Sequence, residues 1–340
     1  MVGMKLAIDF GSANLTIFAE NKGIVLCEPS LMIFDKYSGK PIAMGEEAKK
    51  MRDRLPASMV EVVPIKDGSV SDYDAACLML REYINKICMG RLLKPAVLMC
   101  VPGSVTALEK KTLIDVLTRA GAGRVCFVEE ALAASVGAGV GIRDPKGILI
   151  CDIGGGISDC AVVSMGRIAA EKSVRVGGND LTKAIRDYVF REHGIEVGPG
   201  TAEEIKKTVG SAIFRTEEIC IVAGGKNCET GLPVLFEITS TEVYWILKSY
   251  VEEISDCIRS VLESAPVELV TDVAETGILL CGGTANLFGM DRCIEWSVGL
   301  TTRRAQQPED SAALGLGKLW KEKHFLELNG YVFSSSDEED

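Results

Sequence analysis

The sequence predicts an α/β protein built from two domains, and three observations lead to that prediction. The chain has 340 residues, of which 47% are apolar, so it can bury a larger core than a single small module could. Short β-branched runs alternate with segments of helical periodicity along its length. One strand–turn–strand pattern occurs twice, once near the start of each half.

The first half contains a succession of strand, helix, strand and helix. Residues 96–103, AVLMCVPG, predict a buried strand that a Pro-Gly pair ends. Thr106 and Glu109 then have capping-box spacing, ahead of a helical stripe that stops at Gly121. The run RVCFV predicts the next strand, and EEALAASVGAG predicts the next helix.

The second half continues with helix starts and a hairpin. Thr201 and Glu204 repeat the capping-box spacing and predict a helix start. Thr239 and Glu242 show it again, before a long helix that ends near Pro266. Between these helices, EICIVAGGKNCETGLPVLFEI predicts a hairpin with a long polar turn.

Charge and cysteine usage exclude several classes of protein. The formal charge of −11 and the pI near 5.0 argue against nucleic acid as the main partner, because such proteins need clustered Lys and Arg. The 12 cysteines are scattered and form no C-x-x-C pair, which indicates reduced thiols. The N-terminus enters a strand pattern at once, and nowhere do about 18 apolar residues follow one another. We therefore expect a soluble, cytoplasmic protein.

The repeated pattern predicts phosphate binding. In LAIDFGSANLTIFA (6–19) and LICDIGGGISDCAVV (149–163), a strand reaches an Asp, a glycine-containing turn follows, and a second strand begins. Glycines let backbone N–H groups approach an anion, and consecutive N–H groups form an anion-binding concavity. Two such turns facing each other would hold a polyphosphate. Asp9 and Asp152 would then lie where Mg²⁺, which takes one or two carboxylates plus phosphates, needs oxygen ligands.

Other glycine-rich motifs fail on spacing. No G-x-x-x-x-G-K-[ST] occurs, since AGGKN lacks both the upstream glycine and a hydroxyl residue after Lys226. A dinucleotide-binding G-x-G-x-x-G would lead into a helix, whereas the triple glycine at 154–156 leads into a strand. One turn alone would suggest an ordinary hairpin, but the paired occurrence favours phosphate binding. A third cluster, in TGILLCGGTANLFGMD (276–291), ends a strand where its backbone could approach a nucleotide.

These motifs resemble those of a known superfamily. Asp-x-Gly-[Ser/Thr], Asp-x-Gly-Gly-Gly and a late Gly-Gly-[Thr/Ser/Gly] turn are similar to the phosphate-1, phosphate-2 and adenosine motifs of the actin, DnaK-type chaperone and sugar-kinase superfamily. Within it, the chain resembles the MreB family of bacterial actins from about residue 5 to 320. The segments that carry this resemblance are IDFGSANLTIFAENKGIVLCEPS, GEEAKKM, PIKDGSVSDYD, VPGSVTALEKKTLIDVLTRAGAGRVCFVEEALAASVGAG, RVGGNDLTKAI, GPGTAEEIKKTVG and PEDSAALGLGKLW.

The resemblance implies an actin-like ATPase fold, with two ribonuclease-H-like lobes around a nucleotide cleft and a smaller subdomain in each. The small, polar and acidic C-terminal segment is expected to be a disordered tail. Lobe I is expected at 1–140, with its small subdomain at about 31–63, and the chain is expected to return to it at about 305–330. Lobe II is expected at 141–304, with its small subdomain at about 180–240. The tail is expected at 331–340.

Carried over by position, the resemblance also implies the residues that bind ATP. Asp9 and Asp152 would take part in catalysis by holding Mg²⁺ through water. The first phosphate turn would comprise Ser12, Ala13 and Asn14, and the second would comprise Gly154, Gly155 and Gly156. The adenosine pocket would comprise Glu203, Lys206, Gly282, Gly283 and Thr284.

A carboxylate that positions the attacking water is the remaining catalytic group that the resemblance implies. In VEEALAAS this residue is the second glutamate, Glu130, immediately before the predicted helix. A carboxylate suits the role because phosphoryl transfer depends mainly on placement and charge neutralisation. The simpler interpretation is that Glu130 is an ordinary acidic residue at a helix start, where the helix dipole favours negative charge. The chain departs from the family at Ala131, where Pro is usual, and at Ser12 and Leu15, where Thr is usual.

The stretch NKICMGRLLKPAV is similar to the membrane-binding loop of the family. Its Leu92 and Leu93 are flanked by Lys86, Arg91 and Lys94. Burial of the leucines in lipid would contribute about 1.5–3 kcal/mol each, and a nearby cation about 1 kcal/mol at an anionic surface. One loop would bind weakly, so polymerisation would add avidity. The alternative is that both leucines pack inward as core.

The function that the resemblance implies is that of a cytoskeletal ATPase. Such a protein binds ATP and Mg²⁺ and polymerises into filaments, expected to be paired protofilaments. These would lie at the inner face of the cytoplasmic membrane and organise cell-wall elongation proteins to determine cell shape. Two alternatives within the superfamily are an ATP-binding scaffold with little hydrolysis and a small-molecule kinase. A DnaK-type chaperone is disfavoured, because it would need a substrate-binding domain after the ATPase.

Overall fold

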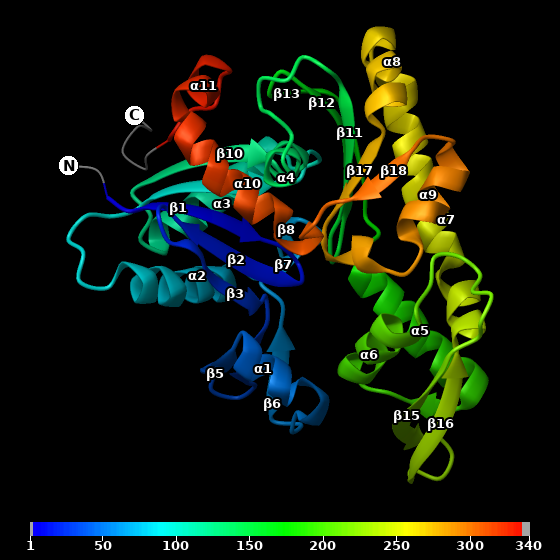
Figure 1. The fold of residues 1–340 in the computed structure, drawn as a ribbon. Helices are drawn as coiled ribbons and strands as arrows, with labels where there is room; N and C mark the ends of the chain where they lie inside the picture. Colours follow the sequence, from blue (N-terminus) through cyan, green and yellow to red (C-terminus); the bar gives the residue numbers. More distant parts are fainter. Residues whose placement is uncertain (1–2, 335–340) are drawn as a thin grey trace.

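The computed structural model describes residues 3–334, and within them the chain forms two large lobes (Figure 1). A five-stranded sheet lies at the centre of each lobe, and a three-stranded sheet lies in each of the smaller parts at the bottom of the view (Figure 1). Helices cover these sheets, so the α/β class predicted from the sequence is confirmed.

The first large sheet is built mostly from the start of the chain. Its strands are β1 (Lys5–Phe10), β2 (Asn14–Ala19), β3 (Gly23–Pro29), β9 (Ala96–Val101) and β10 (Arg124–Glu129). Their order across the sheet is β10-β9-β1-β2-β3. Strand β1 pairs antiparallel with β2 and parallel with β9.

The second large sheet repeats this arrangement. Its strands are β11 (Ile148–Ile153), β12 (Ser158–Ser164), β13 (Arg167–Val174), β17 (Ile278–Cys281) and β18 (Thr302–Arg304). Their order is β13-β12-β11-β17-β18, with β11 antiparallel to β12 and parallel to β17. Strand β11 therefore takes the place in this sheet that β1 takes in the first, as the repeated sequence pattern predicts.

Two three-stranded sheets and one two-stranded ribbon complete the strands that the structure describes. The smaller sheet of the first lobe has the order β5-β4-β6, that of the second lobe has the order β14-β15-β16, and β7 pairs with β8. Strands β15 and β16 form the predicted hairpin, with its turn between them. The bounds are β4 (Met32–Asp35), β5 (Pro41–Met44), β6 (Met59–Val62), β7 (Ile65–Lys66), β8 (Ser69–Val70), β14 (Ile195–Glu196), β15 (Cys220–Asn227) and β16 (Pro233–Thr239).

The helices of the first lobe include two that return from the C-terminal part of the chain. They are α1 (Glu46–Met51), α2 (Tyr73–Cys88), α3 (Ala107–Arg119), α4 (Glu130–Gly137), α10 (Ser311–Leu319) and α11 (Lys323–Leu328), with 3₁₀ turns η1 (Arg52–Arg54), η3 (Pro308–Asp310) and η4 (Trp320–Glu322). The predicted capping box at α3 is confirmed, because Thr106 accepts from the Glu109 N–H and Glu109 accepts from the Thr106 N–H.

The helices of the second lobe confirm one predicted start and correct another. They are α5 (Gly178–His193), α6 (Pro199–Val209), α7 (Ser240–Ser264), α8 (Val267–Thr276) and α9 (Met290–Val298), with the 3₁₀ turn η2 (Gly283–Asn286). Thr239 and Glu242 form the expected capping box of α7. The capping box predicted at Thr201 is wrong, because α6 already begins at Pro199, whose fixed φ suits the first helical position.

Helices α4 and α10 cross between the two large sheets (Figure 1). A Cβ on Gly137 would lie 1.8 Å from the carbonyl oxygen of Ser311, and one on Gly315 would lie 1.7 Å from that of Ala133. Only glycine permits so close a crossing. The core around these helices joins buried residues of both sheets, which fixes the lobes against each other: Ala7, Leu98, Cys126, Val128, Ile148, Ile150, Val163 and Leu279.

The end of the described chain packs on the first lobe. Ser334 forms an isolated antiparallel bridge with Val125, and the buried Phe333 ring stacks on Trp320 at a centroid distance of 5.2 Å. The prediction of disorder is therefore wrong for residues 331–334, because an aromatic pair adds apolar burial that composition alone did not reveal. The rest of the predicted tail, 335–340, lies outside the described residues. Within 3–334, no helix is both long and apolar enough to cross a bilayer.

Candidate functional site

One large cavity, with a volume of about 1330 Å³, lies between the two lobes. Strand β1 contributes Asp9 near its carboxyl end, and β11 contributes Asp152 near its own. Every residue that the sequence predicts for ATP binding or hydrolysis lines this cavity, namely Asp9, Ser12, Ala13, Asn14, Glu130, Asp152, Gly154, Gly155, Gly156, Glu203, Lys206, Gly282, Gly283 and Thr284.

The two glycine turns have the same backbone shape. In the first turn, the N–H of Gly11 donates to the carbonyl of Asn14 at 3.0 Å. In the second, the N–H of Gly154 donates to the carbonyl of Ile157, also at 3.0 Å. Each turn connects a strand that carries the aspartate to an antiparallel neighbour. Both lobes therefore present the same backbone concavity to the cavity.

The two turns are in direct contact. A Cβ on Gly155 would lie 2.7 Å from the Cβ of Ala13, and one on Gly156 would lie 2.9 Å from the Oγ of Ser12. Glycine is thus required at position 155 for the turns to approach, because the Cβ and backbone of Ala13 cannot rotate away. The Ser12 Oγ is buried and has no hydrogen-bond partner within residues 3–334. An oxygen ligand between the turns, such as a phosphate oxygen, would satisfy this hydroxyl.

The carboxyls of Asp9 and Asp152 are both enclosed, and the charge of Asp9 affects the ionisation of Asp152. Burial raises the pKa of Asp9 to about 6, although a hydrogen bond with Cys100 opposes the rise. Burial, followed by the charge of Asp9, raises the pKa of Asp152 well above its usual value. Two enclosed carboxylates repel, and a divalent cation would relieve that repulsion. This donor set fits Mg²⁺, which combines one or two carboxylates with water and phosphate oxygens.

A metal ion would need more ligands than these side chains supply. Within residues 3–334, no group of three or more His, Cys, Asp or Glu residues is arranged to hold an ion by itself. Mg²⁺ keeps several of its waters and commonly binds through one or two carboxylates and substrate phosphates. The residues present therefore fit an ion that arrives with a nucleotide.

Glu130 lies at the first position of α4 and lines the cavity. Burial raises the pKa of its carboxyl well above the usual value, and the charges of Asp152 and Asp9 add to the rise. Its neighbour Glu129 instead accepts a hydrogen bond from the Tyr331 hydroxyl at 2.7 Å and does not line the cavity. Of the two glutamates, only Glu130 is placed to act on a ligand there.

The N-terminus of α5 supports the second glycine turn, a contact that was not among the predicted site residues. The N–H of Gly178 donates to the carbonyl of Gly154 at 3.0 Å, and that of Asn179 donates to Gly155 at 2.7 Å. A Cβ on Gly177 would lie 2.6 Å from the carbonyl carbon of Gly155. The glycine pair in RVGGND, placed before a helical pattern, was the signal for this contact.

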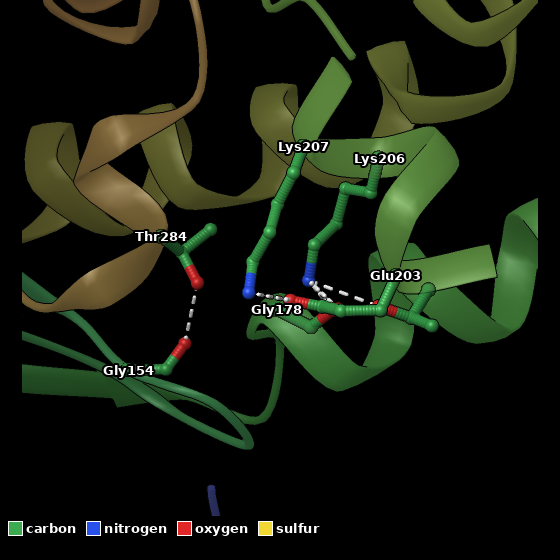
Figure 2. Close-up of polar contacts among 7 residues, drawn as sticks. Gly154, Gly178, Glu203, Lys206, Lys207 and Thr284 are labelled. Atoms are coloured by element: carbon green, nitrogen blue, oxygen red, sulfur yellow. Dashed lines mark hydrogen bonds and ion pairs between the residues drawn. The ribbon is translucent and has the colours of Figure 1, made fainter. Parts of the chain in front are cut away.

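Lys206 and Glu203 form a buried polar cluster beside that turn (Figure 2). The Lys206 Nζ lies 2.6 Å from the Glu203 carboxylate and donates to the Gly178 carbonyl at 2.7 Å and to Thr182 at 2.9 Å. Burial lowers the pKa of Lys206, and Glu203 offsets part of that effect. Lys206 therefore joins α6 to α5, whereas Lys207, 3.3 Å from Glu203, is more exposed.

The third glycine cluster lies against the second turn. Thr284 Oγ1 donates to the carbonyl of Gly154 at 2.8 Å (Figure 2). Gly282 has a φ of +81°, and a Cβ there would lie 2.3 Å from the carbonyl oxygen of Ile153. Only glycine accepts both constraints. The three clusters that the sequence places far apart therefore meet in one cavity.

The predicted membrane loop lies apart from this cavity, between α2 and β9. Leu92 is fully exposed, Leu93 is 45% exposed, and Met89 adds a third exposed apolar side chain. The alternative in which both leucines pack inward is therefore wrong. An exposed apolar tip with flanking cations suits contact with an anionic lipid surface.

Comparison with known proteins identifies relatives over nearly the whole chain. Residues 3–327 match the family model described as MreB/Mbl protein. The cell shape-determining protein Mbl of Bacillus subtilis is 37% identical, covering 93% of this chain and 96% of the relative. The cell shape-determining protein MreB of Escherichia coli is 35% identical, covering 94% and 93%.

Solved structures show the same architecture. MreB5 of Spiroplasma citri bound to ADP superposes with a TM-score of 0.91 at 32% identity, covering 96% of this chain and 99% of that one. The same protein bound to AMPPNP gives the same TM-score at 33% identity, covering 97% and 99%. A MamK double helical filament, at 17% identity, has a TM-score of 0.79 over 94% and 98% of the two chains, which shows the shared actin-like fold. By its fold and by its sequence from residue 3 to 327, the chain belongs to the MreB/Mbl family.

Proposed function

We propose that this protein binds ATP with Mg²⁺ in the cavity between its lobes. The observation that carries the proposal is the contact between the two glycine turns, with Asp9 and Asp152 on the strands that lead into them. Backbone N–H groups from both lobes would bind the phosphates, and the Ser12 hydroxyl would donate to one of their oxygens. The ADP and AMPPNP bound to MreB5 of Spiroplasma citri support this assignment.

Hydrolysis of ATP is the reaction that we assign to the site. Asp9 and Asp152 would hold Mg²⁺ through water, and the ion would supply neutralisation of phosphate charge. Glu130 positions the attacking water, since it lines the same cavity and lies close enough to both aspartates for their charges to raise its pKa.

Family membership supports filament assembly as part of this proposal, and the exposed loop supports membrane attachment. The protein polymerises into paired protofilaments, and Leu92 and Leu93 of many copies contact the inner face of the cytoplasmic membrane. There the filaments organise cell-wall elongation proteins and thereby determine cell shape. The working division of the chain is four subdomains, with the smaller ones at about 31–63 and 180–240.

Sedimentation at high speed with Mg-ATP and anionic liposomes tests these assignments together, with the pellet viewed by negative-stain electron microscopy. Filaments lying on the vesicles are expected. Protein that stays in the supernatant in ATP, in ADP and without nucleotide would contradict assembly. Release of phosphate from ATP, followed in the same samples, tests hydrolysis separately.

A further inference from the structure

One wall of the cavity carries a stacked pair of side chains, Arg215 and Phe288. The guanidinium carbon of Arg215 lies 3.7 Å from the centroid of the Phe288 ring, within the range of a cation–π contact. Both residues line the cavity that contains the glycine turns. Arg215 lies outside the glycine motifs from which the sequence predicts the site, and Phe288 lies in the third of them, 276–291, without a predicted role. The segments that follow α6 and η2 bring the two residues together.

Backbone contacts fix the position of this pair. The N–H of Ala212 donates to the carbonyl of Phe288 at 2.8 Å, and Ser211 forms an isolated parallel bridge with Phe288. Gly289 has a φ of +72°, and a Cβ there would lie 2.4 Å from the side chain of Ile213. The segment after α6 and the segment after η2 are therefore held against each other, so the position of the stacked pair in the cavity wall is fixed by the backbone.

The Arg215 side chain has hydrogen-bonding capacity that the protein does not use. The structure gives it one long hydrogen bond, from Nη2 to the carbonyl of Gly210 at 3.4 Å. Its Nε is buried and has no acceptor within residues 3–334. Burial lowers the pKa of Arg215, yet a guanidinium stays charged at neutral pH. A buried donor without an acceptor is costly, which points to a ligand group as its missing partner.

The position of the pair relative to the phosphate turns indicates which part of a nucleotide it would meet. Thr284 is hydrogen-bonded to Gly154 of the second turn, and Phe288 follows Thr284 by one short 3₁₀ segment. Arg215 follows the helix that carries Glu203 and Lys206. A nucleotide with its phosphates on the turns would extend past Thr284 and bring its base toward this wall.

We propose that Arg215 and Phe288 form the surface on which the base of the nucleotide stacks, and that Arg215 makes the cavity select purine over pyrimidine nucleotides. The proposal rests on the nucleotide binding assigned above. Guanidinium planes and aromatic rings both stack on bases, and the larger purine overlaps more of such a surface.

Binding measurements on the full chain with Mg²⁺ test this proposal, with ATP, CTP and inorganic tripolyphosphate as the probes. The variants are Arg215→Ala, Arg215→Lys and Phe288→Leu. Arg119→Ala is the matched control, because Arg119 stacks on Tyr73 at 5.4 Å and neither residue lines the cavity. Thermal melts report whether each variant folds.

Wild-type protein is expected to bind ATP at least about tenfold more tightly than CTP. Arg215→Ala should weaken ATP binding about tenfold and leave tripolyphosphate binding unchanged. Arg215→Lys should recover less than half of the binding free energy that Arg215→Ala loses, because lysine keeps the positive charge but lacks the planar guanidinium. Phe288→Leu should also reduce the preference for ATP over CTP.

Two results would overturn the proposal while leaving nucleotide binding intact. Equal losses for ATP and tripolyphosphate would mean that Arg215 acts on phosphate through its charge. Equal affinity of the wild type for ATP and CTP would mean that Arg215 and Phe288 do not discriminate between purine and pyrimidine bases. Failure of the proposed function is distinguishable, because wild-type protein would then bind neither nucleotide.

Discussion

Asp53 in η1 of the first lobe accepts a hydrogen bond at 3.0 Å from the backbone N–H of Gly200, in the first turn of α6 in the second lobe. Both residues line the cavity. A carboxylate at a helix N-terminus is stabilised by the unpaired N–H groups and by the helix dipole. This bond joins the two smaller parts of the lobes directly across the cavity that we assign to ATP.

The Asp53–Gly200 contact predicts the effect of a single added methyl group. A Cβ on Gly200 would lie 2.1 Å from the Asp53 carboxylate, so Gly200→Ala should turn the Asp53 side chain away and break this bond. Dissociation of a fluorescent ATP analogue, followed by stopped flow, should become about threefold to tenfold faster, because a hydrogen bond to a charged group is lost. In an Asp53→Ala background, the same Gly200→Ala change should alter the rate less than about twofold. Equal effects in both backgrounds would mean that the Asp53–Gly200 bond does not slow nucleotide release.

Glu130→Ala should separate binding from hydrolysis. The variant should keep its affinity for ATP but release phosphate at least about tenfold more slowly, as expected when a water-positioning group is removed. Glu129→Ala is the matched control, since its carboxylate bonds to Tyr331 and does not line the cavity. Steady-state phosphate release measures both. Unchanged turnover in Glu130→Ala would assign the role to another residue.

The enclosed carboxyls predict how stability depends on pH. Burial raises the pKa of Asp9 and of Asp159 to about 6, and also raises those of Glu130 and Asp152. A carboxyl with a raised pKa binds its proton more tightly in the folded state, so its contribution is present below about pH 4 and is lost as pH rises through about 6.

Thermal melts without nucleotide should therefore show a falling midpoint between about pH 5 and pH 8. Each unit by which folding raises the pKa of a carboxyl corresponds to about 1.4 kcal/mol in the free energy of unfolding. Asp152→Asn should make the fall shallower, because the amide carries no proton equilibrium. The exposed Asp74→Asn change serves as the control and should follow the wild type. A melting midpoint of the wild type that rises over this pH range would contradict the predicted direction of the pH dependence.

The loop at Leu92 and Leu93 predicts a loss of membrane binding without a loss of folding. Changing both residues to Ser should abolish co-sedimentation with anionic liposomes, since each exposed leucine contributes about 1.5–3 kcal/mol when buried in lipid. Leu108→Ser changes a leucine that is 74% exposed elsewhere on the first lobe and should have no effect. Circular dichroism checks folding. Intact membrane binding by the double variant would place the anchor elsewhere.

Local sequence patterns predicted the strands, turns and several helix starts correctly. The glycine turns were predictable because their Asp, glycines and flanking β-branched residues lie within a few positions of one another. The capping boxes of α3 and α7 were predictable for the same reason. Thr201 was misassigned because Pro199 starts α6 two residues earlier, and the fixed φ of proline outweighed a capping pattern.

Long-range packing decided what those patterns could not. Asp53 meets Gly200, and Arg215 meets Phe288, only because the two lobes and the segments after α6 and η2 come together. The ordered position of Phe333 depends on the Trp320 ring beside it in space, and the acidic composition of the segment gave no sign of it.

The sequence by itself determined the fold class, the pairing of the phosphate turns and the family, because these depend on local periodicity and on motifs repeated at a set spacing. Only the tertiary structure decided which side chains face one another in the cavity, which glycines must be glycine, and which carboxyls have raised pKa values. Those properties depend on distances across the space between lobes and on exclusion of water, and no local window of sequence contains either.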